Sequence, residues 1–189
     1  MPKQNLGPKI PAYPMPITLV GAMLNEKANF LTVAWMSMVS YKPHMIAVTL
    51  GNHHATNKGI KANKAFSVNI PHRDSIVKTD YVGIVSAEKV DKSEVFEVFF
   101  GENDRAPLID ECPVNIECSL DQIMINGANE TFIGKITAVH ADSKYMKDGK
   151  VDIALVSPLM LSQNNLSYYS LGERLGQAWG IGNEFKTNE

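Results

Sequence analysis

Residues 29–71 contain the most regular secondary-structure signals of the sequence, and they constrain its fold more than any other stretch. Two apolar segments rich in β-branched side chains, residues 30–39 and 45–50, flank a proline-containing turn. A third segment of the same kind, residues 66–70, ends at a proline. Such segments are typical of strands rather than helices. We therefore expect three consecutive strands here, with a polar turn and a short helical pattern before the third.

Strand-like segments recur on both sides of this stretch, at residues 17–24, 114–125 and 131–141. In residues 114–125 apolar and polar side chains alternate, as they do in a half-buried strand. Together the segments predict about six strands in a single domain, because 189 residues are too few for two comfortable domains. Strands that follow one another at hairpin spacing favour an antiparallel β-barrel over a parallel, doubly wound sheet. We predict a mainly β fold with short helices.

Helical patterns cluster in the middle third of the chain. Residues 56–63 and a segment from residue 72 to 85 are predicted to be short helices. Residues 91–100 are predicted to be another, because their apolar positions follow the i, i+1, i+4, i+5 spacing of one buried helix face. An Asn-Gly pair within residues 126–130 indicates a turn, and we expect its loop to be longer than a two-residue hairpin.

The two ends of the chain are expected to be irregular. Residues 1–16 contain five prolines, which excludes a helix and predicts an extended arm on the body of the protein or on a partner subunit. A final apolar segment, residues 153–161, precedes a tail of residues 162–189. This tail is rich in glycine and aromatic residues and has no clear period. We expect it to be irregular and packed on the body.

Composition and charge exclude several kinds of function. Hydrophobic residues make up 44% and charged residues 20%, and the net charge of -2 argues against bulk electrostatic binding of nucleic acid. The sequence has no run of 18 apolar residues, and its first residues lack the apolar core of a signal peptide. We expect no membrane association and a cytoplasmic location.

The two cysteines, Cys112 and Cys118, are expected to be buried structural thiols. If they lie along one strand, their separation is about 20 Å at about 3.3 Å per residue. That distance is far beyond the reach of a disulfide. Their spacing also differs from that of a CxxC redox or zinc pair.

The polar turn at residues 51–58 is the best candidate for a phosphate site. The sequence contains no glycine-rich P-loop and no GxGxxG motif, so a nucleotide has to be held in another way. A helix N-terminus presents free backbone N–H groups and a partial positive charge, which suit a phosphate. Thr56 and Asn57 add donors, and His54 or Lys58 adds charge. The alternative interpretation is an ordinary helix cap with solvated polar neighbours.

Adjacent histidines, His53 and His54, raise the question of a metal site. Neighbouring side chains point in different directions, and no third ligand stands at a suitable spacing. Zinc sites need three or four convergent ligands. We therefore predict no metal.

Residues 32–37 are the second candidate for cofactor binding. Small and hydroxyl-bearing side chains interrupt an otherwise apolar strand there, so a flat ring can lie against the backbone. Backbone N–H and C=O groups then meet the polar edge of the ring, as is usual for a flavin. The alternative is an ordinary barrel strand with Trp35 in the core. Together with the phosphate site, this segment predicts a cradle for a phosphate-bearing aromatic cofactor, with FMN as the first candidate.

Five segments of the sequence occur in a characteristic order: NFLTVAWMSMVSYKP, HHATNKGIKANKAFSVNIP, DYVGIVSAEKVDKSEVF, APLIDECPVNIEC and YYSLGERLG. As an ordered set they resemble the flavin reductase-like family, and within it the flavoredoxin subgroup, from about residue 14 to residue 180. The resemblance implies a six-stranded, FMN-binding split β-barrel. It also implies a homodimer with flavin sites near the subunit interface.

The resemblance also implies which residues bind the cofactor. The segment that lines the flavin ring and its ribityl chain corresponds to Asn29, Thr32, Ala34, Trp35, Met36 and Ser37. The phosphate loop corresponds to His53, His54, Thr56 and Asn57. Further positions on the cofactor side are Asn69, Ser86 and Lys92. It identifies no catalytic side chain.

The sequence departs from the family pattern at several positions. Val82 stands where many relatives have cysteine, Ala87 replaces a common glycine, and Asn129 falls where relatives often carry histidine. His54 stands where many relatives have arginine. Because histidine loses its charge near neutrality, this replacement predicts a pH-sensitive affinity for phosphate.

Three functions agree with these features. The first is an FMN-dependent redox protein of the flavoredoxin type, which exchanges electrons with a donor or acceptor protein. The second is an NAD(P)H:flavin oxidoreductase, and the third is a flavin-binding module without redox turnover. In the first, the flavin carries the electrons while the protein supplies binding and orientation, so no catalytic residue is predicted.

Overall fold

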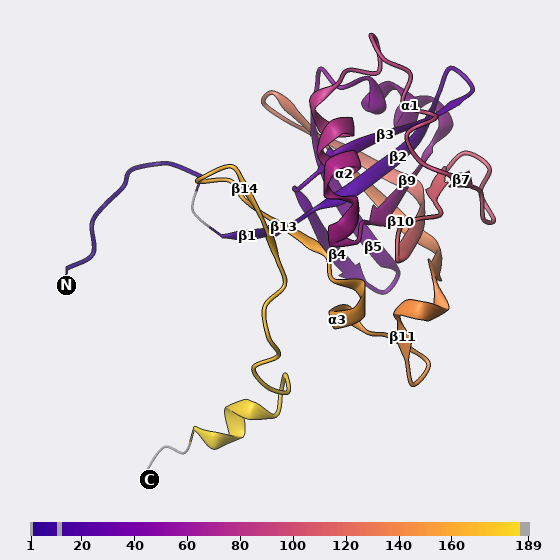
Figure 1. The fold of residues 1–189 in the computed structure, drawn as a ribbon. Coiled ribbons are helices and arrows are strands. Elements are labelled where there is room, and N and C mark those ends of the chain that lie inside the picture. The colour runs from indigo at the N-terminus through magenta and orange to yellow at the C-terminus, as the bar shows by residue number, and fades with distance from the viewer. Residues whose placement is uncertain (1, 11–12, 186–189) are drawn as a thin grey trace.

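The computed structural model describes residues 2–10 and 13–185, and a seven-stranded sheet lies at its centre (Figure 1). Each pair of neighbouring strands in this sheet is antiparallel. In sheet order the strands are β3 (Lys27–Val33), β2 (Thr18–Leu24), β6 (Ala65–Ile70), β9 (Val114–Asn126), β10 (Asn129–Ala141), β5 (His44–Gly51) and β4 (Met36–Tyr41). The mainly β, antiparallel fold predicted from the sequence is confirmed.

The sheet curls into a barrel that is split between its two edge strands, β3 and β4. These strands are consecutive in the chain, yet within the described residues they are not paired with each other. The predicted strand of residues 30–39 is therefore two strands, and the sheet has seven rather than six. The break falls at Ala34 and Trp35. Before it, β3 pairs with β2, and after it, β4 pairs with β5. There the Thr49 N–H donates to the Trp35 carbonyl at 2.9 Å.

Inside the barrel, side chains from strands on all sides form one apolar core. Val20, Leu31, Val48, Phe66 and Phe132 are among its fully or almost fully buried members. Alternation along each strand points these residues inward, because successive side chains of a strand face opposite sides of the sheet. The helix α1 (Ala55–Asn63), predicted as residues 56–63, adds Ile60 to the same core.

A second layer covers the outer face of β2 and β3. It includes the 3₁₀ turn η1 (Arg73–Ser75) and helix α2 (Ile76–Ile84), which together confirm the helical segment predicted from residue 72. Figure 1 shows α2 lying across β2 and β3. Leu19, Phe30, Val82 and Phe96 pack together between the layers, with the Phe30 and Phe96 rings edge to face at 5.8 Å.

The predicted helix at residues 91–100 is wrong. Instead, β7 (Val98–Phe99) pairs with β8 (Leu108–Ile109) in a small antiparallel ladder. The phenylalanines whose spacing resembles one face of a helix differ in exposure: Phe96 is buried and Phe100 is exposed. Pairing with β8 and burial of Phe96 against Phe30 thus override the local pattern, as tertiary context often does.

The hairpin between β9 and β10 is tighter than expected. Asn126 pairs directly with Asn129, which leaves a turn of only two residues, Gly127 and Ala128. Gly127 has φ +59, a conformation that glycine adopts without steric cost and that two-residue hairpins require. The expectation of a longer loop is therefore wrong.

Both ends of the chain meet in a second, three-stranded sheet. Its strands are β1 (Pro14–Pro16), β13 (Leu159–Ser162) and β14 (Ser167–Ser170). The predicted apolar segment of residues 153–161 is divided into a helical turn, α3 (Ile153–Val156), and β13. The two elements are separated at Ser157, the C-cap residue of α3, whose φ is +45.

The expectation that the tail packs on the body holds for its first part only: Ser167–Ser170 forms β14, and the Tyr168 hydroxyl donates to the Asp80 Oδ1 of α2 at 2.7 Å. Figure 1 shows residues 171–185, including the 3₁₀ turn η3 (Ile181–Glu184), running away from the barrel, as residues 2–10 also do. Trp179 is 100% exposed, so the apolar side chains of the tail find no cover within the described chain. The parts of the predicted arm and tail at residues 1, 11–12 and 186–189 lie outside the described residues.

The remaining elements form a small surface excursion between β10 and α3. They are the 3₁₀ turn η2 (Ser143–Tyr145) and the two-residue strands β11 (Met146–Lys147) and β12 (Lys150–Val151). In the described ranges, no helix is long and apolar enough to cross a membrane.

Candidate functional site

A cavity of about 220 Å³ lies between β3, the start of α1 and the segment that follows α2. Its lining consists of Leu31, His53, His54, Ala55, Thr56, Gly83, Ile84, Val85, Ser86, Ala87 and Lys92. Five predicted cofactor residues are among these: His53, His54, Thr56, Ser86 and Lys92. The structure therefore brings most of the predicted phosphate loop together with two positions more than 25 residues away in the chain.

The N-terminus of α1 lines this cavity with His54, Ala55 and Thr56. His54 is the N-cap residue, and it makes no side-chain capping hydrogen bond. The first turn, Ala-Thr-Asn-Lys, contains no acidic side chain that would satisfy its backbone N–H groups. A helix start of this kind favours a bound anion, because its N–H groups and dipole both attract negative charge.

Asn29 and Thr56 form a buried polar pair behind the helix start. Asn29 and Thr56 are 3% and 2% exposed, and the Asn29 Nδ2 donates to the Thr56 Oγ1 at 2.9 Å. The Asn29 Oδ1 is buried without a hydrogen-bond partner among the described residues. Because burying an unpaired polar atom is costly, this oxygen fits a ligand that supplies a donor, such as a hydroxyl group.

Lys92 places a positive charge at the same cavity. Its Nζ donates to the carbonyl oxygens of Phe30 at 3.2 Å and Val82 at 2.7 Å. The side chain is buried, and no carboxylate of the described residues forms an ion pair with it. Burial therefore lowers the pKa of Lys92 to about 8. A buried ammonium group without a counter-ion fits an anionic ligand.

The two histidines lie beside this charge. Their rings are 4.2 Å apart. Burial lowers the pKa of His54, and the nearby charges of His53 and Lys92 lower it further. In the free protein His54 is therefore less readily protonated than an ordinary histidine. A bound phosphate would favour its charged form.

A second cavity, of about 260 Å³, lies at the split of the barrel. Residues Ala34, Trp35, Met36 and Ser37 line it, together with β1 and the facing residues of β5. Trp35 is 38% exposed, so it lies at the surface of the split and not in the core. The segment predicted to lie against a flat ring is thus open to a ligand.

Three predicted residues have other partners. The Asn57 amide donates to the Gly51 carbonyl at 3.1 Å and to the Glu130 Oε2 at 2.8 Å, so it braces the turn before α1. The Thr32 hydroxyl donates to the Thr79 carbonyl and joins β3 to α2. Neither side chain is among those that line the cavity at α1.

Asn69 is the third, and it lies on the outer face of β6, away from both cavities. Its amide donates to the Leu19 carbonyl and the Ser67 Oγ, both at 3.0 Å. Its Oδ1 accepts from the Ile109 N–H at 3.1 Å and the Asn115 Nδ2 at 2.8 Å. Because Phe66 and Val68 point into the barrel, the alternation of the strand turns Asn69 the other way. Its role is to join β6 to β2, β8 and β9.

Sequence reasoning missed Gly83 as a residue of the site. A Cβ at this position would lie 3.0 Å from the Thr32 Cβ, so glycine allows the end of α2 to lie close against β3. The signal in the sequence was a glycine near the end of a predicted helix.

The cysteines take no part in the site. Cys112 and Cys118 are both free and buried, as predicted. Burial raises the pKa of Cys118 to about 12, which keeps it a neutral thiol. Among the residues that the structure describes, no three His, Cys, Asp or Glu side chains gather as metal ligands.

The split barrel defines a class of fold in which solved flavin proteins occur, and the cavity at the start of α1 is suited to an anion. A flavoredoxin from Methanosarcina acetivorans is 40% identical, with a TM-score of 0.95 over 98% of this chain and 100% of that one. The flavoredoxin of Desulfovibrio vulgaris (Miyazaki F) is 34% identical, with a TM-score of 0.89 over 95% and 99%. An FMN-binding protein from Thermus thermophilus, at 20% identity and a TM-score of 0.80 over 94% and 99%, shares the fold.

Residues 10–169 match the flavin reductase like domain. An uncharacterised protein of Archaeoglobus fulgidus is also 31% identical over 144 residues, which cover 75% of this chain and 80% of the relative. The chain belongs to the flavin reductase-like family. The resemblance drawn from the sequence is confirmed, and with it a flavin-binding redox function on a split barrel.

We expect the substitution Asn69→Ala to separate stability from flavin binding. The Ile109 N–H and the Asn115 amide would each lose a buried acceptor, so the free energy of unfolding should fall by about 2–4 kcal/mol. Flavin affinity of the folded protein should not change. Urea unfolding and a flavin titration measure the two quantities. The exposed Asn165→Ala is the control, and a loss of affinity without a loss of stability would return Asn69 to the cofactor site.

Proposed function

We propose that the protein binds FMN and works as an electron-carrying flavoprotein of the flavoredoxin type. The observation that supports this most is that the uncapped α1 N-terminus and the Lys92 ammonium group line one cavity, and that Lys92 has no ion-pair partner among the described residues. A phosphate monoester is a small dianion, which such a site suits. Riboflavin lacks that group, so the site favours FMN over the free vitamin.

In the proposed complex, the phosphate lies in the cavity at the start of α1 and the flavin ring lies in the cavity at the split of the barrel. The backbone of the first turn of α1 and the Thr56 hydroxyl donate to the phosphate, while Lys92 and His54 balance its charge. The buried Asn29 Oδ1 accepts from a hydroxyl of the ribityl chain. The ring lies at the split of the barrel, against Ala34–Ser37 and beside Trp35.

When bound, a flavin supplies the transfer of one or two electrons. The protein's residues have simpler tasks. Residues 34–37 orient the ring, the α1 start anchors the other end, and the buried Lys92 holds a positive charge close by. We assign no acid–base role to any side chain, because electron transfer of this kind needs none.

An anaerobic visible spectrum tests this function. The protein is supplemented with FMN, desalted and measured before and after addition of NADH. Retained absorbance bands at the usual flavin wavelengths would support the cofactor, and a colourless protein would overturn it. Bleaching only by a reduced carrier protein would support the electron carrier. Rapid bleaching by NADH alone would make the protein a reductase instead.

We expect Thr56→Ala to weaken FMN binding by about 1–3 kcal/mol, the usual effect of losing a hydrogen bond to a charged group. Thr56→Ser keeps the hydroxyl and is the matched control, with an affinity close to that of the unchanged protein. Fluorescence titration with FMN and with riboflavin separates the phosphate contact from the rest. An equal loss for both ligands would place the phosphate elsewhere.

The affinity for oxidised FMN should fall as the pH rises from 7 to 9. In the free protein the pKa of Lys92 is lowered to about 8, so the ammonium group loses its proton in this range. The phosphate monoester stays fully ionised, because its second pKa is about 6. If only the charged lysine binds well, the dissociation constant rises about tenfold over the two pH units.

Lys92→Gln is the control for this dependence. It should bind FMN more weakly at pH 7 and show a flat profile from pH 7 to 9. Riboflavin should give a flat profile with the unchanged protein. A profile that stays steep in the variant would assign the titration to another group.

We also propose that the protein forms a homodimer, so that a second copy of this chain is its partner. Large apolar side chains are exposed on β4, at the β9–β10 hairpin and along the tail: Met38, Val39, Tyr41, Ile123, Met124, Ile125, Leu175, Trp179 and Phe185. Extended apolar surfaces of this kind mark interaction sites. Sedimentation velocity of the whole chain tests this, and a monomer at micromolar concentration would contradict it.

A further inference from the structure

A buried carboxylate, that of Glu130 on β10, contacts α1 and has no part in the proposed function. Glu130 is only 8% exposed, and it lies two residues before Phe132, whose ring is in the core of the barrel. Residues two apart on a strand share a face, so Glu130 belongs to the inner face of the barrel. A charge in such a place is costly unless it is paired and hydrogen-bonded.

Both oxygens of this carboxylate accept hydrogen bonds from side chains of α1. The Glu130 Oε1 accepts from the Lys61 Nζ at 2.5 Å, and its Oε2 accepts from the Asn57 Nδ2 at 2.8 Å. Asn57 and Lys61 are four residues apart, so they share one face of the helix. The hydrogen bond from Lys61, helped by that from Asn57, lowers the pKa of Glu130. Glu130 is therefore ionised at neutral pH, and it ties α1 to β10.

Through Asn57 this contact reaches the turn that precedes α1. The Asn57 amide also donates to the Gly51 carbonyl at 3.1 Å, and the same carbonyl accepts from the His54 N–H at 3.1 Å. A further bond, from the Asn52 N–H to the Ala128 carbonyl at 2.9 Å, joins the turn to the β9–β10 hairpin. The position of His54, the N-cap residue of α1, thus depends on contacts that begin at β10.

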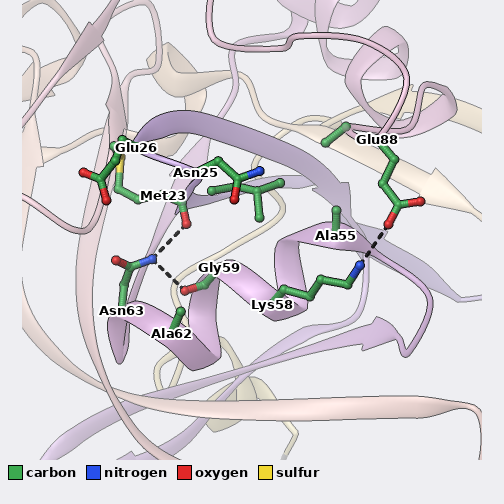
Figure 2. Close-up of a pocket in the computed structure, with 11 residues that line it drawn as sticks. Met23, Asn25, Glu26, Ala55, Lys58, Gly59, Ala62, Asn63 and Glu88 are labelled. Atoms are coloured by element: carbon green, nitrogen blue, oxygen red, sulfur yellow. Dashed lines mark hydrogen bonds and ion pairs between the residues drawn. The ribbon is translucent and has the colours of Figure 1, made fainter.

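The C-terminal end of α1 is held by other contacts, on the side of the helix that faces a groove of about 680 Å³ (Figure 2). There the Asn63 amide donates to the Met23 and Gly59 carbonyls, both at 2.8 Å (Figure 2). Asn63 lies about 12 Å along the axis from the helix start, at about 1.5 Å per residue. The Lys58–Glu88 ion pair on this side is well exposed and contributes little.

We propose that Glu130 is a positioning residue for phosphate recognition: through Asn57 it holds the turn at residues 51–54 and the first turn of α1 in the arrangement that binds the flavin phosphate. This inference rests on the proposed function, which places the phosphate at the start of α1. A helix start binds an anion through N–H groups that converge on it, so a shift of the first turn weakens binding. Lys61 balances the carboxylate, whose charge would otherwise oppose the phosphate.

The first test compares FMN with riboflavin, which lacks the phosphate. With Glu130→Ala, the dissociation constant for FMN should rise about five- to twentyfold, because Asn57 loses its acceptor and the turn is no longer held. The dissociation constant for riboflavin should change less than about twofold. Fluorescence titration with the two flavins measures both constants.

Three further variants control this comparison. Glu130→Gln keeps an acceptor for Asn57, and the partly exposed Lys61 can turn to solvent, so FMN affinity should stay within about threefold of the unchanged protein. Asn57→Ala breaks the same chain of contacts at its next member and should reproduce the selective loss even if Glu130→Ala does not fold. Asn63→Ala removes two hydrogen bonds from the other end of the helix. It should lower the melting temperature without changing the ratio of the two dissociation constants.

The second test uses the protein without flavin. Burial, with the charges of His53 and Lys92, lowers the pKa of His54 in the unchanged protein. Glu130→Ala should release the turn and expose this ring, so the pKa of His54 should rise towards the ordinary value of about 6.5. Loss of a nearby carboxylate would by itself lower that pKa, so the sign of the change separates release of the turn from a direct effect of charge. An NMR titration measures it, with the His54 signal assigned by its loss in His54→Gln.

The outcomes separate this proposal from the proposed function. A loss of FMN affinity alone, together with a raised pKa of His54, would support it. If Glu130→Ala weakens both flavins equally or neither of them, or if Glu130→Gln loses as much as Glu130→Ala, the proposal is overturned and the FMN site stands. If neither flavin binds the unchanged protein, the proposed function fails and the phosphate role of Glu130 with it, whereas the titration of His54 still decides whether Glu130 holds the turn.

Discussion

The crossing of the chain from β3 to β4 at Ala34 and Trp35 is the constraint on which the rest of the structure depends. It turns the two strands into opposite edges of one sheet, so the barrel closes around its core and still has an open seam. An unpaired strand edge presents free backbone groups, which proteins normally cover. Here the Lys92 ammonium group meets the Phe30 carbonyl of the β3 strand. The cavity at the start of α1 is lined by Leu31 of β3, and the second cavity is lined by Met36 and Ser37 of β4.

The outer layer explains how a lysine can be buried there. Helix α2 packs on β3 through Phe30 and Val82, and the close approach at Gly83 brings the end of the helix to the seam. The chain then returns over β3, and Lys92 donates to carbonyls from both elements. These two carbonyls accept two of the three N–H groups of the ammonium group, and Lys92 also lines the cavity at the start of α1. The packing of α2 on β3 therefore also holds the positive charge of Lys92 at the cavity.

Local patterns in the sequence were enough for much of the fold. The alternation in β9, the β-branched segments of β5 and β6 and the helical pattern of α1 depend on neighbours in the chain, and each is predicted correctly in kind. The helix at residues 91–100 failed because its phenylalanines meet partners far away, such as Phe30. Asn69 shows the same limit: its polar side chain is visible in the sequence, but its hydrogen bonds to Ile109 and Asn115 on the outer face of β6 are not.

By itself, the sequence determined the antiparallel strands, the family and the polar turn that opens α1, because periodicity and composition encode local geometry. Only the tertiary structure decided which polar side chains meet. It brought Lys92 to Phe30 across 62 residues, turned Asn57 towards Glu130, and left the Asn29 Oδ1 without a hydrogen-bond partner in the described part of the chain. It also opened the groove beside α1. Such convergence depends on how layers pack, and no pattern along the chain records it.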